Sequence, residues 1–336
     1  MFKDEKKKII RDTFRGSLYE LAAKKLGVKR SIIGYTKGQK SDGKIFLRPI
    51  TKLEKGKKST LVLSSTTHKT SYLGMKIAVD KILTNQILKA NKLPVPEQIN
   101  VKNKIELKKF LEQYKKIIIK PYDSRCGKDV FTEICDLKKA LKIYFSLKNK
   151  YHRIIAEEQI LGNDYRVLVI NYKVKAVLQR IPPYVIGDGR KTILELINQE
   201  NNLRKRNKKL KPIRIDYRIK YYLKSQGLSL KFIPNQGEKI QISNVANISA
   251  GGIGRNVTHK IHPQNKKIAE RAAKIINLDV AGVDIIAPSI DKPIRENGGK
   301  IIEVNGGPDL KIHYNVFYGK PINPAEEIIN YLLFNQ

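Results

Sequence analysis

Hydrophobic residues recur every three or four positions in several stretches of the chain, which is the spacing of one helical face. Residues 7–26 are the first example, with Phe14 and Leu18 on the predicted buried side. The same spacing predicts helices over residues 78–90, 107–114, 137–146, 263–276 and 325–333. Pro94 and Pro96 follow the second helix and begin an extended segment, because proline cannot continue a helix.

Short runs rich in β-branched residues alternate with these helices and predict strands. Residues 44–48 and 59–63 lie between glycine and lysine clusters, which indicates a small N-terminal sheet. Asn171 and Tyr172 form a predicted turn between two later runs. The further extended segments are residues 116–121, 153–159, 165–170, 174–180 and 240–243, and the two runs around Asp284 and Glu303. The mixture of elements predicts an α+β fold.

Three oxygen-bearing side chains occur in the last two apolar runs. The strand period of two places Glu303 and Asn305 on one face. It also points Ile302 and Val304 into the core. Asp284, in the preceding run, fits the same face of a neighbouring strand. Oxygen ligands without nearby Cys or His favour Mg²⁺ or Mn²⁺, and Mg²⁺ completes its shell with water and nucleotide phosphates. The alternative is polar strand ends facing solvent, but three such residues together favour a cation site and ATP chemistry.

The chain carries a large positive charge. Its 67 Lys and Arg exceed its 31 Asp and Glu, which gives a net charge of +36. Such an excess attracts nucleic acid, acidic peptides or nucleotide phosphates in a salt-sensitive way. A compositional bias of the source genome, spread over solvated faces, is the alternative. The densest basic run, residues 203–214, lacks the aromatic residues of a single-strand stacking surface and predicts a mobile basic loop.

Length and composition limit the class of protein. The 336 residues, 41% of them hydrophobic, suffice for two or three lobes. No run approaches the length of a membrane span, and the first residues lack the apolar core of a signal peptide. We therefore expect a cytoplasmic protein that does not associate with membranes. Cys126 and Cys135 are accordingly predicted to be reduced thiols.

Three basic residues at predicted strands are candidates for phosphate or carboxylate binding. Lys120 ends an apolar strand, where an ammonium group can reach nucleotide phosphates. The next segment, residues 122–130, has the length of a phosphate-covering turn but a single glycine. Arg166 and Arg180 lie on consecutive strands and could reach one pocket. The alternatives are a solvent-facing lysine at a strand end and arginines at the rim of a surface hairpin.

Seven blocks of sequence, in the same order, resemble the ATP-grasp ligases. The nearest resemblance is to the ATP-grasp portion of the cyanophycin synthetases, followed by the bifunctional glutathione synthetases. It extends over about residues 60–334. The blocks are residues 80–84, 93–96, 119–121, 157–166, 185–192, 247–252 and 302–305.

The resemblance implies an ATP-grasp fold, in which two α+β lobes grip ATP beside a small N-terminal domain. The corresponding domains are residues 1–75, a small lobe at 76–155 and a large lobe at 156–336. The implied ATP-binding residues are Lys81 and Lys120 at the phosphates, the backbone of Glu157, Glu158, Gln159 and Ile160 at the adenine, and Asp164 at the ribose. The implied magnesium ligands are Asp284, Glu303 and Asn305.

The same resemblance implies a two-step ligation. A substrate carboxylate attacks the γ-phosphoryl group of ATP, assisted by Lys120 and Arg180, and gives an acyl phosphate. An amine then attacks this intermediate, assisted on the substrate side by Arg166 and by the loop that contains Asn247, Ser249, Gly251 and Gly252. The lobe with residues 122–130 is expected to close as a lid and exclude water.

This chain also departs from the cyanophycin synthetases. Ser124, Asp129 and Asp309 replace glycines of the family pattern. The chain stops at Gln336, so we expect neither the Mur-ligase-like domain nor the glutamate–cysteine ligase domain of the two related families.

The leading hypothesis is therefore an ATP-dependent carboxylate–amine ligase for a peptide or amino acid, with an acidic polymer as one candidate product. A glutathione-type or glutamate-adding ligase is the alternative within the enzyme class. A non-catalytic module that binds an acidic polymer or nucleic acid, and a scaffold subunit for an active partner, are alternatives of other classes. ATP-grasp relatives are commonly dimers or tetramers, so we expect a homodimer or homotetramer.

Overall fold

The computed structural model describes residues 14–39, 45–122, 129–207 and 209–334. The described residues form two compact units. One contains residues 178–257 and 315–321, and is called unit 2 below; unit 1 contains the remainder. The predicted domain boundaries after residues 75 and 155 both fall inside unit 1, and the three-domain division stays a prediction.

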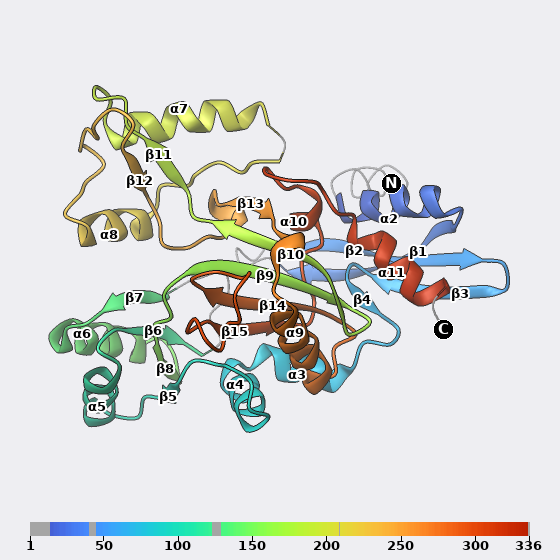
Figure 1. The fold of residues 1–336 in the computed structure, drawn as a ribbon, viewed down its shortest axis with the longest axis horizontal. Coiled ribbons are helices and arrows are strands. Elements are labelled where there is room, and N and C mark those ends of the chain that lie inside the picture. The colour runs from blue at the N-terminus through green and yellow to red at the C-terminus, as the bar shows by residue number, and fades with distance from the viewer. Residues whose placement is uncertain (1–13, 40–44, 123–128, 208, 335–336) are drawn as a thin grey trace. The chain divides into compact units, whose positions relative to one another are not determined.

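The first layer of unit 1 joins segments from both parts of the chain (Figure 1). Four antiparallel strands are ordered β1-β2-β3-β4, and helix α2 packs against helix α11 beside them. Buried Leu18, Leu53, Ile328 and Leu332 belong to the shared core. The elements are α2 (Phe14–Leu26), β1 (Lys29–Gln39), β2 (Ile45–Lys55), β3 (Lys58–Leu63), β4 (Thr66–Thr67), α11 (Pro324–Ile329) and the π-helical turn η3 (Asn330–Phe334). The predicted N-terminal helix and small sheet are confirmed over the described residues.

The helix predicted over residues 78–90 is wrong at its start. The chain instead forms α3 (Tyr72–Val79) and α4 (Lys81–Ala90), separated by Asp80 in an extended conformation. The Asp80 carboxylate accepts the N–H groups of Ile82 and Leu83, both at 3.0 Å, so its side chain begins α4. A polar cap therefore prevails over the continuous hydrophobic pattern.

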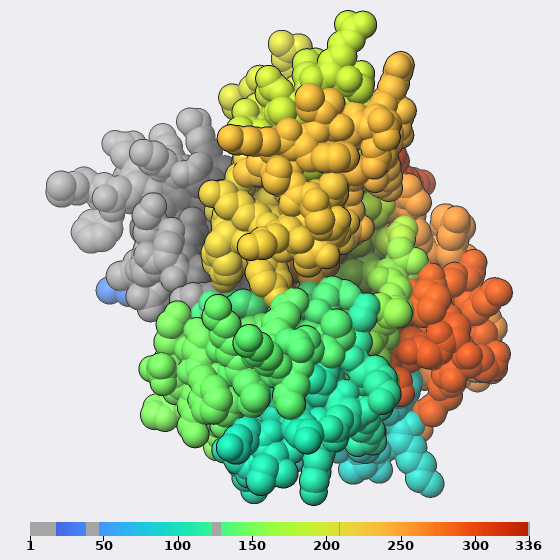
Figure 2. All heavy atoms as spheres, turned by 90° about the vertical axis from the view of Figure 1, so that its left-hand side faces the viewer, coloured from blue at the N-terminus to red at the C-terminus, as the bar shows by residue number. Residues whose placement is uncertain are grey.

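A second antiparallel sheet of unit 1, ordered β5-β8-β6-β7, packs against two helices. Leu107 and Phe110 of α5 and Tyr144 of α6 contribute to a core shared with Ile117 and Ile119. The elements are β5 (Gln98–Asn100), α5 (Lys104–Tyr114), β6 (Ile117–Pro121), β7 (Phe131–Ile134), α6 (Leu137–Lys148) and β8 (Ile154–Glu158). Figure 2 shows the surface of these residues in teal and green. The predicted strands and helices of this region are confirmed.

The third sheet carries the candidate site. In unit 1, strand β14 lies between β9 and β15 and is antiparallel to both. The predicted turn at Asn171 and Tyr172, both with positive φ, joins β9 to β10, which continues into unit 2. Gly74 of α3 lies so close to the end of α9 that an added Cβ would be 2.5 Å from the Ile276 carbonyl oxygen. The elements are β9 (Asn163–Ile170), β10 (Lys173–Ile181), η2 (Thr258–Lys260), α9 (Pro263–Ile276), β14 (Val280–Ala287), β15 (Lys300–Asn305) and α10 (Lys311–Tyr314).

Unit 2 has its own core, to which Val185, Ile197, Leu223 and Ile240 belong. Figure 1 shows its helices α7 and α8 on opposite sides of the antiparallel pair β11–β12. Strand β13 pairs with the end of β10. The elements are β11 (Tyr184–Ile186), α7 (Ile193–Lys205), α8 (Tyr217–Ser225), β12 (Lys239–Gln241), η1 (Ile248–Ala250) and β13 (Ile253–Asn256).

The mobile loop predicted over residues 203–214 is wrong for its first residues. Residues 203–205 form the end of α7, and Arg204 is only 2% exposed. Its Nη1 donates to the carbonyl oxygens of Lys211 at 2.9 Å and Gly251 at 2.6 Å, and its Nε donates to Glu200 at 2.7 Å. Charge density alone predicts solvation, whereas these bonds tie the two ends of the run together. Residue 208 lies outside the described part.

Two further expectations concern the membrane and the thiols. Across the described residues, no helix combines the length and hydrophobicity that a membrane span requires. Cys135 is an exposed free thiol, as predicted, whereas Cys126 lies outside the described residues.

Candidate active site

The three predicted metal ligands lie on two adjacent strands of unit 1. Asp284 of β14 is directly opposite Glu303 of β15, and Gly282 is opposite Asn305. Cross-strand partners project from the same face of an antiparallel sheet. The Nδ2 of Asn305 lies 3.5 Å from Asp284 Oδ2 and 3.4 Å from the Gly282 carbonyl oxygen. The strand period therefore leads to two carboxylates and an amide side by side, with Asp284 only 7% exposed.

A β-bulge adjoins this pair. The register shifts after Asp284, because Ile285 is opposite Ile301 rather than Ile302. The prediction that Ile302 points into the core is wrong for this reason: Ile302 is half-buried, while Val304 and Ile301 are buried. Bulges commonly re-aim side chains beside functional sites. Here the extra residue lets the apolar alternation change face next to Glu303.

Arg166 holds the Asp284 carboxylate from the other neighbouring strand. It is opposite Asp284 in the β9–β14 pairing, and its Nε and Nη2 donate to the two carboxylate oxygens, the second at 2.9 Å. Both side chains are about one-tenth exposed. Gly282 leaves space for this arginine, because an added Cβ would be 3.0 Å from Arg166 Cδ. A fixed cation therefore neutralises a largely buried carboxylate, a contact that sequence reasoning missed because it depends on strand order.

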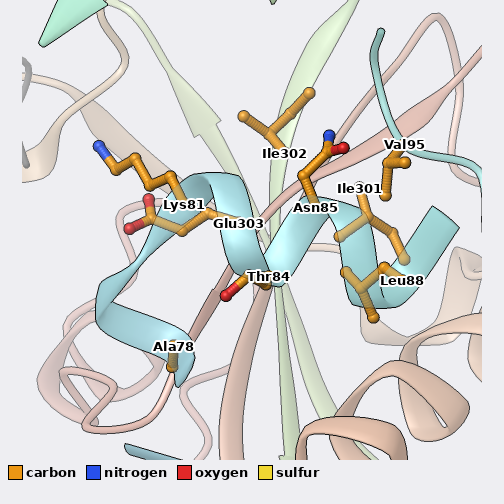
Figure 3. A pocket seen from close by; sticks show the side chains of 9 residues that line it. All are labelled: Ala78, Lys81, Thr84, Asn85, Leu88, Val95, Ile301, Ile302 and Glu303. Atoms are coloured by element: carbon orange, nitrogen blue, oxygen red, sulfur yellow. The ribbon is translucent and has the colours of Figure 1, made fainter. Parts of the chain in front are cut away.

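Lys81 and Glu303 line the same small hollow (Figure 3). Lys81 is the first residue of α4, directly after the Asp80 cap. The hollow has a volume of about 10 Å³, enough for roughly one water molecule. Its walls are formed by Ala78, Lys81, Thr84, Asn85, Leu88, Val95, Ile301, Ile302 and Glu303. The helix start thus places an ammonium group beside one of the predicted metal ligands.

Lys120 and Glu157 form a buried ion pair. Lys120 Nζ lies 2.7 Å from Glu157 Oε1, and the side chains are 8% and 3% exposed. The interpretation of Lys120 as a solvent-facing lysine is therefore wrong. Sequence reasoning assigned only the backbone of Glu157 to the site. An acidic residue directly after Ile154, Ile155 and Ala156 was the available signal for a buried carboxylate.

The segment predicted to bind adenine follows Glu157. The N–H groups of Glu158 and Gln159 donate to the carbonyl oxygens of Glu97 at 2.9 Å and Lys116 at 3.2 Å. The Gln159 side chain accepts the N–H of Glu133 at 2.7 Å and donates to the Glu133 carboxylate. The segment is thus held rigidly by its neighbours. Ile160 is half-buried, and Asp164 lies in β9 opposite Ile286.

The predicted residues on the substrate side include several in unit 2. Arg180 lies in β10 opposite Gly254. The Asn247 side chain accepts the N–H and hydroxyl of Ser249, each at 3.1 Å. Gly251 has a φ of 104°, which a residue with a side chain rarely adopts. The N–H of Gly252 donates to the Asn247 carbonyl oxygen at 3.0 Å.

Two of the departures from the family pattern have local explanations. Asp129 adopts a φ of 53°, in the left-handed region that favours glycine, and its carboxylate accepts the Tyr151 hydroxyl at 2.5 Å. Asp309 accepts the N–H of Lys311 at 3.2 Å, at the start of α10. Ser124 and the rest of the covering turn at 123–128 lie outside the described residues.

Comparison with known proteins identifies the class of this fold and site. A family model of the prokaryotic glutathione synthetase ATP-grasp domain matches residues 80–246, and one of the RimK-like ATP-grasp domain matches residues 240–332. This chain belongs to the ATP-grasp superfamily. The predicted superfamily and the predicted α+β ATP-grasp fold are confirmed.

Similarity to particular proteins is more extensive. The chain is 36% identical over 276 residues to a cyanophycin synthetase of Trichormus variabilis, covering 80% of this chain and 31% of that protein. It is 36% identical over 295 residues to a glutathione biosynthesis bifunctional protein of Clostridium perfringens, covering 84% and 37%. A crystal structure of a bifunctional glutathione synthetase from Pasteurella multocida shares the fold, with a TM-score of 0.67 at 23% identity, covering 95% of this chain and 43% of that chain. The chain spans about a third of the length of the curated relatives it matches.

Proposed function

We propose that this chain is an ATP-dependent ligase that joins the carboxylate of a peptide or amino acid to an amine through an acyl phosphate. The observation that carries the proposal is the cross-strand pair of Asp284 and Glu303, with Asn305 beside it. The presence of all three side chains in an ATP-grasp domain favours an active enzyme over a module that has lost its metal site.

We assign Mg²⁺ or Mn²⁺ to Asp284, Glu303 and Asn305. The donors are all oxygen, which suits hard divalent cations. Arg166 already places a positive charge on the Asp284 carboxylate, so this position accommodates a cation. Within the described part of the chain, no group of three or more His, Cys, Asp or Glu forms a complete metal site. Two carboxylates and an amide fit a cation that takes its remaining ligands from nucleotide phosphates and water, and that offsets phosphate charge when bound.

The nucleotide is proposed to bind beside these ligands. Lys81 and Lys120 would bind phosphate oxygens, and Arg180 would lie near the transferring phosphoryl group. The Lys120–Glu157 ion pair supports this assignment, because it holds an ammonium group in one orientation within an apolar sheet. Residues 157–160 would contact the adenine through their backbone, and Asp164 would accept the ribose hydroxyl groups.

The chemistry would proceed without a nucleophilic side chain. A carboxylate oxygen of the first substrate attacks the γ-phosphorus, and ADP leaves. The amine then attacks the acyl carbon, and phosphate leaves with the electron pair of its bond to carbon. Arg166 and the loop at residues 247–252 are proposed to contact the substrate during this step. A substrate contact by Arg166 requires its guanidinium to share or release Asp284.

Release of ADP tests the proposal. The purified chain is incubated with ATP, Mg²⁺ or Mn²⁺, and pools of Asp, Glu, dipeptides and γ-glutamylcysteine. Glu303→Ala is expected to slow ADP release by at least about 100-fold, roughly 2.7 kcal/mol of transition-state stabilisation. The matched control is Glu296→Ala, which removes an exposed carboxylate that does not line the hollow. Full activity of Glu303→Ala would refute the assigned site.

A glutathione-type or glutamate-adding ligase is the second candidate. The match of residues 80–246 to the glutathione synthetase domain favours it. Mass spectrometry of the products separates the two: γ-glutamylcysteine plus glycine would give the glutathione mass, whereas an acidic-chain ligase would add a residue to a peptide. If no substrate stimulates ADP release while polyanions still bind, the non-catalytic alternative is correct. Sedimentation analysis tests the proposed homodimer or homotetramer.

A further inference from the structure

Unit 2 has a large excess of positive charge whose acidic residues are all engaged locally. Its sequence contains 17 Lys and Arg against 5 Asp and Glu. Asp188, Glu200 and Asp216 form ion pairs with Lys191, Arg204 and Arg218, respectively. Glu195 belongs to the capping box of α7, and Glu238 accepts the N–H of Asn235 at 2.8 Å. The acidic side chains therefore do not neutralise most of the basic surface.

Two adjoining hollows lie along α7. The first, of about 350 Å³, is formed mainly by apolar and aromatic side chains, among them Tyr184, Phe317 and Tyr318. The second, of about 420 Å³, is more open and polar, and includes Lys191, Asn202 and Arg206. Gln199 and Leu203 line both hollows, so they form one continuous groove. We call it the α7 groove.

The helical spacing explains why the groove has two characters. Glu195, Gln199, Asn202 and Arg206 are separated by four, three and four residues, so they share one stripe of α7. This stripe offers amide and cationic groups. Leu203 lies beside it and is 56% exposed. Exposure of a large apolar side chain in a groove, rather than singly on a convex surface, marks a binding site.

Three aromatic residues form the apolar end. The rings of Phe317 and Tyr318 meet edge to face, with centroids 4.7 Å apart. Arg255 lies 4.9 Å from the centroid of the Tyr318 ring, and Lys239 lies 4.2 Å from that of Tyr184. A hydrogen bond with Tyr318 and burial raise the pKa of Tyr184, so its hydroxyl stays protonated at neutral pH. The floor is therefore a preformed, neutral aromatic surface flanked by cations.

We propose that the α7 groove binds an extended acidic peptide segment. Charge complementarity selects acidic side chains, which would reach Lys191 and Arg206. The Asn198 and Asn202 amides can bond to the backbone of such a peptide, and Leu203 and the aromatic floor would contact its stems. This proposal rests on the proposed ligase function, for which it names an acidic peptide as the bound substrate chain.

Fluorescence anisotropy of a labelled ten-residue oligo-aspartate tests the groove without ATP or metal. The double variant Lys191→Gln/Arg206→Gln is expected to weaken binding at least tenfold, and Leu203→Ala to weaken it about threefold. The matched control is Lys220→Gln/Lys224→Gln, which removes the same charge from exposed positions of α8 outside both hollows. Its binding should change less than twofold. An equal loss in both double variants, or no loss in the first, would refute the groove.

Two further measurements separate this inference from the proposed function. A DNA oligonucleotide of equal charge should bind at least tenfold more weakly than oligo-aspartate; tighter binding of DNA would instead assign the groove to nucleic acid and overturn the peptide proposal. Glu303→Ala should bind oligo-aspartate as the unmodified chain does. If Glu303→Ala binds normally and no substrate releases ADP, the ligase function fails while the groove stands. If ADP release persists but the Lys191/Arg206 variant binds normally, the groove alone fails.

Discussion

At the scale of residues, the site is organised by charges that are buried in pairs. Arg166 pairs with Asp284, and Lys120 with Glu157. Moving such charges out of water costs several kcal/mol, and removing one partner leaves the other uncompensated. These pairs are therefore weak evidence for stability but good evidence for position, since each fixes a functional group in one orientation.

The Lys120–Glu157 pair allows stability and nucleotide binding to be separated. Lys120→Met leaves the Glu157 carboxylate buried without its partner, and we expect a loss of roughly 3–5 kcal/mol of unfolding free energy. Lys120→Met/Glu157→Leu should recover most of that loss. ATP binding should stay absent in both variants. Urea unfolding and calorimetric ATP titration measure the two effects.

The matched control for this pair is Lys89→Met. Lys89 and Glu97 form an ion pair whose side chains are 54% and 40% exposed, so breaking it should cost less than about 1 kcal/mol. If Lys120→Met is no more costly than Lys89→Met, the low exposure of Lys120 does not reflect its energetics.

A second residue-scale prediction concerns pH. Burial, with the negative charge of Asp279 as the second cause, raises the pKa of Tyr331 to about 12. An unfolded tyrosine titrates near about pH 10. Above that pH the unfolded chain loses this proton first, so the free energy of unfolding falls as the pH rises through 12. The contribution is complete below pH of about 10.

Urea unfolding at several alkaline pH values checks this sign. Tyr331→Phe lacks the titrating hydroxyl, so its stability should decline less steeply between pH of about 10 and 12 than that of the unmodified chain. Tyr72→Phe, at a side chain that is 76% exposed, should leave the slope unchanged. Parallel curves for Tyr331→Phe and the unmodified chain would contradict the assignment.

At the scale of elements, caps decide where side chains of the site begin. Asp80 ends α3 and begins α4, so it determines that Lys81 occupies the first turn. Hydrophobic periodicity predicted one continuous helix here. The break arises because the Asp80 carboxylate satisfies two backbone N–H groups that an unbroken helix would have bonded otherwise.

Asp80→Ala tests this role. The lost cap should cost about 1 kcal/mol of unfolding free energy and lower the affinity for ATP, because the α4 start loosens around Lys81. Asp80→Asn should retain most of both. Asp136→Ala removes the cap of α6, which accepts the Lys139 N–H at 2.7 Å, and should cost similar stability without changing ATP affinity. Equal effects of Asp80→Ala and Asp136→Ala on ATP binding would show that the α4 start is not involved.

At the scale of the whole molecule, distant parts of the chain share polar anchors as well as cores. Asp279, between α9 and β14, is 1% exposed. Its carboxylate accepts the hydroxyl of Thr67 at 2.5 Å and that of Thr70 at 2.7 Å. These bonds connect the segment after the N-terminal sheet to the central sheet of unit 1.

Removal of this anchor should affect the N-terminal sheet first. Thr67→Val/Thr70→Val leaves the buried Asp279 carboxylate without two donors, which should cost about 1–3 kcal/mol. Hydrogen exchange should then accelerate in β1–β3 more than in β9 and β14. Thr60→Val, which removes a hydroxyl bonded to His68 at 2.8 Å in the same region, is the matched control. A uniform acceleration across all sheets would contradict a local anchor.

The sequence by itself determined the local features: most helices and strands, the ATP-grasp class, and the identity of the paired oxygen donors Asp284, Glu303 and Asn305. Periods of two and 3.6 residues, and ordered motif blocks, are properties of neighbouring residues and need no knowledge of distant ones. The outward side chains of β15 were predictable for that reason, up to the bulge at Ile302.

Only the tertiary structure decided which distant groups meet. Arg166 reaches Asp284 because β9 and β14 are neighbours in the sheet, and Glu157 reaches Lys120 because β8 pairs with β6. Arg204 is buried because carbonyl groups from two other segments converge on its guanidinium. Strand order and loop closure bring these partners together across 37 to 118 positions of sequence in the three cases, and no local pattern encodes such a pairing.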